Sequence, residues 1–170
     1  MSTTLDTLNQ ADAAAFTAAL GHLFEHSPWV AAEAWSQRPF ADAETLHRAL
    51  CAAMHAAPME RQRALLEAHP DLAGRLALQH QLTAESTREQ ASAGLSRLSA
   101  EELTTFQTMN AAYRARFGFP FIICARLNAK AAILAAMRAR LPNSPEQEFA
   151  TALAEIEKIA WLRLQDCLQH

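Results

Sequence analysis

Apolar residues recur at steps of three and four over long parts of the chain, which is the spacing of one buried face of an α-helix. The first clear run comprises Leu103, Phe106, Met109, Tyr113 and Phe117. The second comprises Phe149, Leu153, Ile156, Ala160, Leu164 and Cys167. The alternation of apolar and polar residues that marks a half-buried β-strand is almost absent. The pattern therefore predicts an all-α fold.

Capping signals indicate where several helices begin. The segments S-x-x-E at 99–102 and S-x-x-Q at 144–147 have the capping-box form, and Pro145 stands at the first helical position of the second. The pair at 27–28, Ser-Pro, precedes another apolar run, and Gly118 supplies a helix stop. Weaker starts lie near residues 9–12, at Asp42, at Pro58 and at Ser86.

Length and composition agree with one domain. The chain has 170 residues, of which 51% are apolar, and this is enough for one continuous core. No repeat, low-complexity tract or linker rich in glycine and serine divides it. We therefore expect a single compact domain over residues 1–170, with about seven or eight helices. The apolar run at 119–124 has no helical period, and we expect it to be an extended or irregular buried segment.

Charge and cysteine usage exclude several classes of protein. The net charge of −3 gives no basic surface for nucleic acid. No run approaches the roughly 18 uncharged apolar residues of a membrane span, and the first ten residues lack the pattern of a signal peptide. The three cysteines are widely spaced without a C-x-x-C pair, which indicates neither a disulfide framework nor a zinc knuckle. We expect a cytoplasmic protein without a membrane segment.

Two catalytic motifs compete with ordinary structural roles. The segment HLFEH at 22–26 matches the H-x-x-E-H pattern of inverted zinc peptidases, but an amphipathic helix end with solvated or capping histidines is the better interpretation. Cys124 has Arg126 two positions later, which favours a thiolate, yet it lies in the most apolar run of the chain. For Cys124 a buried structural thiol is the better interpretation.

Three further charged or titratable positions are candidates for an anion site. Ser86-x-x-Glu89 has the capping-box form, so Glu89 either caps a helix or faces a pocket. Arg163 falls on or beside the apolar stripe of the last helix. It either binds a ligand there, or its stem covers apolar surface while its guanidinium reaches solvent or a carboxylate on a neighbouring helix. His69 directly precedes a proline, which excludes helical geometry for the histidine and holds it at a bend.

Several motifs occur together in one order. They are HPDLAG at 69–74, S-x-x-E-Q at 86–90, A-G-L at 93–95 and MNAAYRARFGFPFIICA at 109–125. Together with FEHSPWVAAEAWSQRPF at 24–40 and the C-terminal helix, this series resembles the OHCU decarboxylase family over nearly the whole chain. The family carries a stretch similar to HLFEH without a metal, and the resemblance therefore favours no metal site.

The resemblance implies an all-α, cofactor-free carboxy-lyase, commonly a homodimer. Such an enzyme acts on a small anionic substrate, 2-oxo-4-hydroxy-4-carboxy-5-ureidoimidazoline, in urate degradation, and it releases CO₂ and (S)-allantoin. By the same resemblance, His69 is the catalytic histidine and Glu89 its acidic partner. The residues implied to bind substrate are Pro70, Ser86, Gln90, Phe121, Ile122, Ile123, Cys124, Ala125 and Arg163. A non-catalytic helical binding or scaffold domain that retains the pocket is the competing interpretation.

Overall fold

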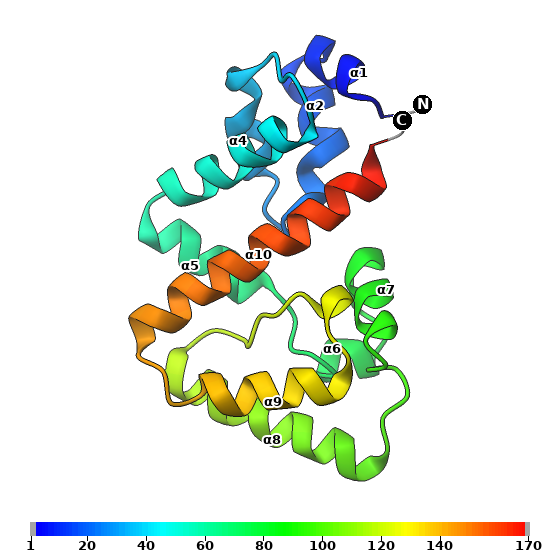
Figure 1. The fold of residues 1–170 in the computed structure, drawn as a ribbon, viewed down its shortest axis with the longest axis vertical. Helices are drawn as coiled ribbons and strands as arrows, with labels where there is room; N and C mark the ends of the chain where they lie inside the picture. The colour runs from blue at the N-terminus through cyan, green and yellow to red at the C-terminus, as the bar shows by residue number, and fades with distance from the viewer. Residues whose placement is uncertain (1–2, 169–170) are drawn as a thin grey trace. The chain divides into compact units, whose positions relative to one another are not determined.

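The computed structural model describes residues 3–168, without the side chains of Arg75 and Leu76. Within this range the chain forms ten α-helices, three short 3-10 helices and no β-strand (Figure 1). Seven of the α-helices are at least eight residues long. The described part of the chain confirms the all-α fold and the predicted number of substantial helices.

The helices cluster into two compact units. Unit 1 comprises the chain up to Ala68 together with the chain from Glu157 onward, and unit 2 comprises His69–Ile156. Helix α10 (Pro145–Cys167) contributes its first part to unit 2 and its last part to unit 1. The single domain expected over residues 1–170 stays a prediction.

Unit 1 is a group of short helices around leucine and phenylalanine side chains. Its further helices are α1 (Leu5–Gln10), α2 (Ala13–Leu20), η1 (Gly21–Leu23), α3 (Trp29–Ala34), η2 (Trp35–Gln37), α4 (Ala43–Ala56) and α5 (Met59–Ala68). Helix α3 packs against both α2 and α4. Asp12 and Asp42 cap α2 and α4, because each carboxylate accepts a hydrogen bond from the amide three residues later.

Unit 2 carries most of the predicted site residues. Its further helices are α6 (Arg75–Leu78), α7 (Ala84–Ser92), α8 (Ala100–Phe117), η3 (Ala125–Leu127) and α9 (Lys130–Arg140). Helix α8 lies beside α9, and α7 contacts η3 (Figure 1). The run at 119–124 has no regular secondary structure and is buried between α8 and η3, in agreement with the predicted extended or irregular segment.

Most predicted helix boundaries are confirmed. Both expected capping boxes form, at 99–102 and at 144–147, and Gly118 ends α8 with a φ of 80°. Two boundaries were wrong. Helix α3 begins one residue later than expected, at Trp29, and the Ser27 hydroxyl donates to the Glu25 carbonyl instead of capping the helix. Helix α7 is capped by Thr83, so the segment at 86–89 lies inside the helix.

The predicted apolar stripes are largely buried. On α10 the buried positions include Leu153, Ile156, Ala160 and Leu164. On α8 the buried row is Phe106, Asn110, Tyr113 and Phe117, so Asn110 takes the place expected for Met109, which is only half-buried. No helix within residues 3–168 is long and apolar enough to cross a membrane.

Candidate functional site

His69 lies at the end of a helix, where the sequence placed it. Helix α5 ends at Ala68, and His69 forms a bend directly before Pro70. The histidine is only 7% exposed. A proline disfavours helical geometry for the residue before it, which agrees with the end of the helix at this point. The fold therefore holds a buried imidazole at a rigid turn.

The residues after Pro70 form a tight loop, 71–74. Ala73 has a φ of 51°, a left-handed conformation that is costly for any residue with a β-carbon. A Cβ on Gly74 would lie 2.6 Å from the Cβ of Asp71, so only glycine fits there. Strained conformations of this kind persist only where surrounding contacts determine them.

Helix α7 places three polar side chains on its buried face. Ser86, Glu89 and Gln90 are 6%, 8% and 6% exposed, and their spacing of three and four puts them on one side of the helix. The Gln90 side chain accepts a hydrogen bond from the Ala73 amide at 3.0 Å and donates one to the Asp71 carbonyl at 3.3 Å. Gln90 thereby ties α7 to the loop that follows His69.

The buried segment 121–125 is held by side chains from helices α9 and α10. Arg140 donates to the Ile122 carbonyl at 2.8 Å, and its guanidinium lies 4.2 Å from the centre of the Phe121 ring. The Cys124 amide donates to the Glu155 carboxylate at 3.3 Å. The segment holds five predicted substrate contacts. At one of them, Cys124, the backbone amide is bound to the carboxylate of Glu155.

The surroundings of the Cys124 thiol favour its protonated form. Burial raises the pKa of this thiol, and the negative charges of Glu155 and Glu89 raise it further. A thiol held protonated in this way is a poor nucleophile, which agrees with the structural role expected for Cys124.

A fully buried carboxylate supports the same region. Glu148 is 0% exposed and accepts hydrogen bonds from the Tyr113 hydroxyl at 2.6 Å, Arg140 Nε at 2.8 Å and Asn143 Nδ2 at 3.1 Å. Burial and the hydrogen bond to Glu148 raise the pKa of Tyr113, so the hydroxyl stays protonated and donates. The network fixes the guanidinium that holds Ile122.

Arg163 belongs to unit 1, where it is 4% exposed. Its guanidinium forms an ion pair with the buried Glu25 carboxylate at 3.0 Å and donates to the His22 carbonyl at 3.2 Å. The structure therefore contains the carboxylate partner that one interpretation of Arg163 expected. The contact also gives Glu25 of HLFEH a structural role.

The zinc-peptidase interpretation of HLFEH is wrong. Its two histidines do not share a helical face, because residues 21–23 form a 3-10 turn and His26 has a φ of 48°. Both His22 and His26 are exposed. Among the residues that the structure describes, no three His, Cys, Asp or Glu side chains are grouped so as to hold a metal ion.

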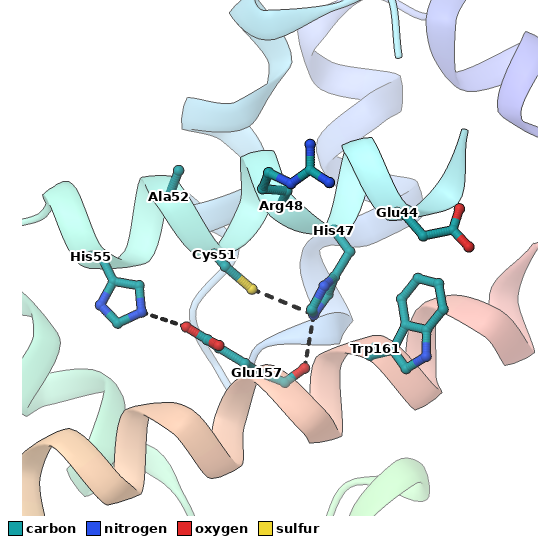
Figure 2. A pocket seen from close by; sticks show the side chains of 8 residues that line it. All are labelled: Glu44, His47, Arg48, Cys51, Ala52, His55, Glu157 and Trp161. Carbon is teal, nitrogen blue, oxygen red and sulfur yellow. Dashed lines mark hydrogen bonds and ion pairs between the residues drawn. The ribbon is translucent and has the colours of Figure 1, made fainter. Parts of the chain in front are cut away.

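Unit 1 contains a separate open cavity of about 610 Å³ between α4 and α10 (Figure 2). His47 Nε2 donates to the Glu157 carbonyl at 2.8 Å, and His55 binds the Glu157 carboxylate. Burial, with a smaller contribution from Glu157, raises the pKa of Cys51 to about 12. The two histidines are therefore occupied by α10, and the Cys51 thiol is not activated.

Unit 2 contains buried side chains of the types that can transfer protons. It joins a buried imidazole, His69, to a loop that is bound by α7, and the same helix carries the buried carboxylate of Glu89. Imidazole and carboxylate groups are the usual general acids and bases of enzymes. Nearby, the segment 121–125 supplies buried backbone whose position is fixed by Arg140 and Glu155.

Sequence reasoning missed three supporting residues of this site. They are Asn110, Glu148 and Glu155. A signal existed for each of them. Asn110 falls four residues after Phe106 and three before Tyr113, on the buried face of α8, while Glu148 and Glu155 are seven residues apart on α10. A polar residue on an apolar stripe needs a partner, and the sequence alone does not name it.

Comparison with known proteins gives one consistent result. A family model described as OHCU decarboxylase matches residues 9–165. A 2-oxo-4-hydroxy-4-carboxy-5-ureidoimidazoline decarboxylase from Mus musculus is 45% identical over 161 residues, which are 95% of this chain and 90% of the relative. The protein of that name from Halalkalicoccus jeotgali is 44% identical over 163 residues, which are 96% of this chain and 90% of the relative.

A solved structure is also similar to this chain. The crystal structure of an (S)-allantoin synthase superposes with a TM-score of 0.76 at 32% identity. The match covers 98% of this chain and 54% of that chain, so the present chain spans about half the length of the solved protein.

Proposed function

This chain belongs to the OHCU decarboxylase family, and from that premise we propose that it converts 2-oxo-4-hydroxy-4-carboxy-5-ureidoimidazoline to (S)-allantoin and CO₂. This reaction belongs to urate degradation and makes the protein a carboxy-lyase. Family membership over residues 9–165 favours the enzyme over a non-catalytic helical binding domain. The structural observation that carries the proposal is the burial of His69 and Glu89 in one compact unit.

The substrate itself explains why a small set of side chains suffices. The bond between C4 and the carboxylate breaks, CO₂ leaves, and the electron pair moves toward the adjacent C5=N bond of the ring. The C5=N electrons move onto the ring nitrogen, which gains a proton. The C4 hydroxyl then loses its proton and becomes a carbonyl, and C5 gains a proton, so the reaction takes up one proton overall. The C5=N bond acts as the electron sink, and the protein has to position the ring and deliver the proton to one face.

His69 and Glu89 are the proposed catalytic residues. A neutral His69 hydrogen-bonds the C4 hydroxyl or the carboxylate and transfers the proton. Glu89 orients the ring and ureido nitrogens, or it sets the protonation state of the histidine. A buried imidazole at a rigid bend supports this role for His69, because general acid-base catalysis needs a fixed donor–acceptor distance.

A further set of residues is proposed, by the family resemblance, to contact the substrate. They are Pro70, Ser86, Gln90, the segment Phe121–Ala125 and Arg163. The burial of Ser86 and Gln90 on the same face of α7 as Glu89 supports the first group. Arg163 carries a planar guanidinium that suits ureido and carboxylate oxygens, and its pairing with Glu25 holds that plane in one orientation.

The proposed function is tested by measuring which enantiomer of allantoin is formed. Freshly generated substrate decays without enzyme to racemic allantoin, so circular dichroism of the product separates catalysed from spontaneous reaction. The wild-type protein is expected to give one enantiomer. His69→Asn is expected to lower kcat by about 10² to 10⁴ with the fold retained. A His69→Asn protein with the wild-type rate would remove His69 from the mechanism.

Further properties are proposed from the family resemblance and, for nucleic acid and location, also from charge and cysteine usage. They are a homodimeric assembly, activity without a cofactor or metal, the lack of nucleic-acid partners and a cytoplasmic location. Light scattering on the purified protein measures the first, and assay after extensive treatment with a chelator measures the second. Each stays a prediction.

A further inference from the structure

We propose that Asn110 is a positioning residue for His69, because it anchors the loop that follows the histidine. The inference rests on the proposed function and adds to it a residue on α8, outside the groups placed in contact with substrate. Asn110 is 7% exposed and lies within the buried row of α8, between Phe106 and Tyr113.

The contact itself is short and specific. Asn110 Nδ2 donates a hydrogen bond of 2.8 Å to the carbonyl oxygen of Leu72. Leu72 is three residues after His69 and is itself buried, at 7% exposure. A buried carbonyl requires a donor, and at this carbonyl the Asn110 amide meets that requirement.

The loop is held from two helices. From α7, Gln90 binds the Ala73 amide and the Asp71 carbonyl, and from α8, Asn110 binds the carbonyl of Leu72 between them. Arg114, four residues after Asn110, adds an ion pair of 3.0 Å to the Asp71 carboxylate. That pair is substantially exposed to solvent, so it contributes less than the buried amide does.

Backbone strain explains why the anchor matters. Ala73 keeps a φ of 51°, which an alanine leaves readily if its neighbours release it. Without the Asn110 amide, the Leu72 carbonyl loses its donor and is expected to turn toward another donor or water. Ala73, the strained residue beside it, can then relax. Only Pro70 and Asp71 separate Leu72 from His69, so this relaxation shifts the imidazole.

A small shift of the imidazole is costly to proton transfer. A displacement of about 1 Å at a reacting group lowers a rate by up to about 10²-fold. We therefore expect Asn110→Leu, which keeps approximate size and removes the amide donor, to lower kcat by about 10- to 100-fold. KM is expected to change much less than kcat, since Asn110 is not placed against the substrate.

Asn9 offers a matched control in unit 1. Its Nδ2 donates to the Phe40 carbonyl at 2.9 Å and its Oδ1 accepts from the Phe40 amide at 2.8 Å, so it also anchors a loop. Asn9→Leu removes the same kind of contact from a loop without a proposed catalytic residue. Asn9→Leu is expected to lower the unfolding midpoint but to leave kcat within about twofold of the wild type.

A double-mutant cycle separates positioning from general damage. Activity is measured for the wild type, Asn110→Leu, His69→Asn and the double variant, by circular dichroism of the allantoin formed. If Asn110 acts through His69, Asn110→Leu lowers the residual rate of His69→Asn by less than about twofold. Equal fold losses in both backgrounds would show a role independent of the histidine and overturn the proposal.

The remaining outcomes are also decisive. Wild-type kcat for Asn110→Leu overturns the positioning role while the proposed function stands. A wild type that gives only racemic allantoin overturns the proposed function, and the positioning role with it. If Asn110→Leu does not fold, Asn110→Ser, which is smaller and leaves room for water at the Leu72 carbonyl, takes its place in the same cycle.

Discussion

Removing the hydroxyl of Tyr113 measures how much the buried Glu148 network stabilises the protein. The hydroxyl donates to Glu148 at 2.6 Å, and both residues are at most 1% exposed. A hydrogen bond to a charged group contributes roughly 1.5–3 kcal/mol, about twice the value for a neutral pair. Glu148 keeps Arg140 and Asn143, so the larger cost of an unpaired buried charge does not apply.

We therefore expect Tyr113→Phe to lower the free energy of unfolding by about 1.5–3 kcal/mol. For a chain of this size, that corresponds to a fall in Tm of roughly 3–12 °C. Urea unfolding at neutral pH, followed by far-ultraviolet circular dichroism, measures the change. Tryptophan fluorescence provides a second probe, because Trp29, Trp35 and Trp161 all belong to unit 1. Different midpoints for the two probes would show that the units unfold separately.

Thr104→Val is the matched control for this measurement. It removes one hydroxyl from the same helix, α8, but at an exposed position where the hydroxyl donates only to the Ala100 carbonyl. The control is expected to change the free energy of unfolding by less than about 0.5 kcal/mol. A Tyr113→Phe protein no less stable than the control would refute the reasoning, because the hydrogen bond to Glu148 would then contribute nothing.

Two further predictions concern Arg163 and Cys51. Arg163→Lys is expected to weaken binding of (S)-allantoin by about tenfold or more, because an ammonium lacks the planar fork of a guanidinium. Calorimetry measures the Kd. An unchanged Kd would mean that Arg163 only pairs with Glu25 and does not bind the ligand. Cys51 has its pKa raised from 9.0 to about 12, so between these values the unfolded thiol loses its proton first and stability falls as pH rises. Urea unfolding midpoints at about pH 8 and about pH 10 should show this fall, and Cys51→Ala should make the fall smaller. An equal fall in both proteins would contradict the assignment of the pH dependence to Cys51.

The local elements were predictable because their causes are local. The capping boxes at 99–102 and 144–147 form as the spacing required, and Gly118 ends α8. The bend at His69 follows from the proline after it. One boundary was misplaced: Ser86-x-x-Glu89 has the form of a cap, but Thr83 caps α7, so Ser86 and Glu89 lie inside the helix.

The candidate site was predictable in its residue types and less so in its contacts. A motif places His69, Glu89 and Gln90 in the chain, but only packing shows that Gln90 binds the loop after the histidine. The carboxylate partner of Arg163, Glu25, lies 138 residues away in sequence, and only the structure shows this contact. No short-range pattern carries information about a contact of that span.

By itself, the sequence determined the helical class, most helix ends and the position of one histidine at a bend, because spacing, capping and proline act over a few residues. The tertiary structure decided which buried polar groups meet: Asn110 with Leu72, and Glu148 with Tyr113 and Arg140. The physical reason is that a buried polar atom must find a partner, and the partner depends on which helices pack together.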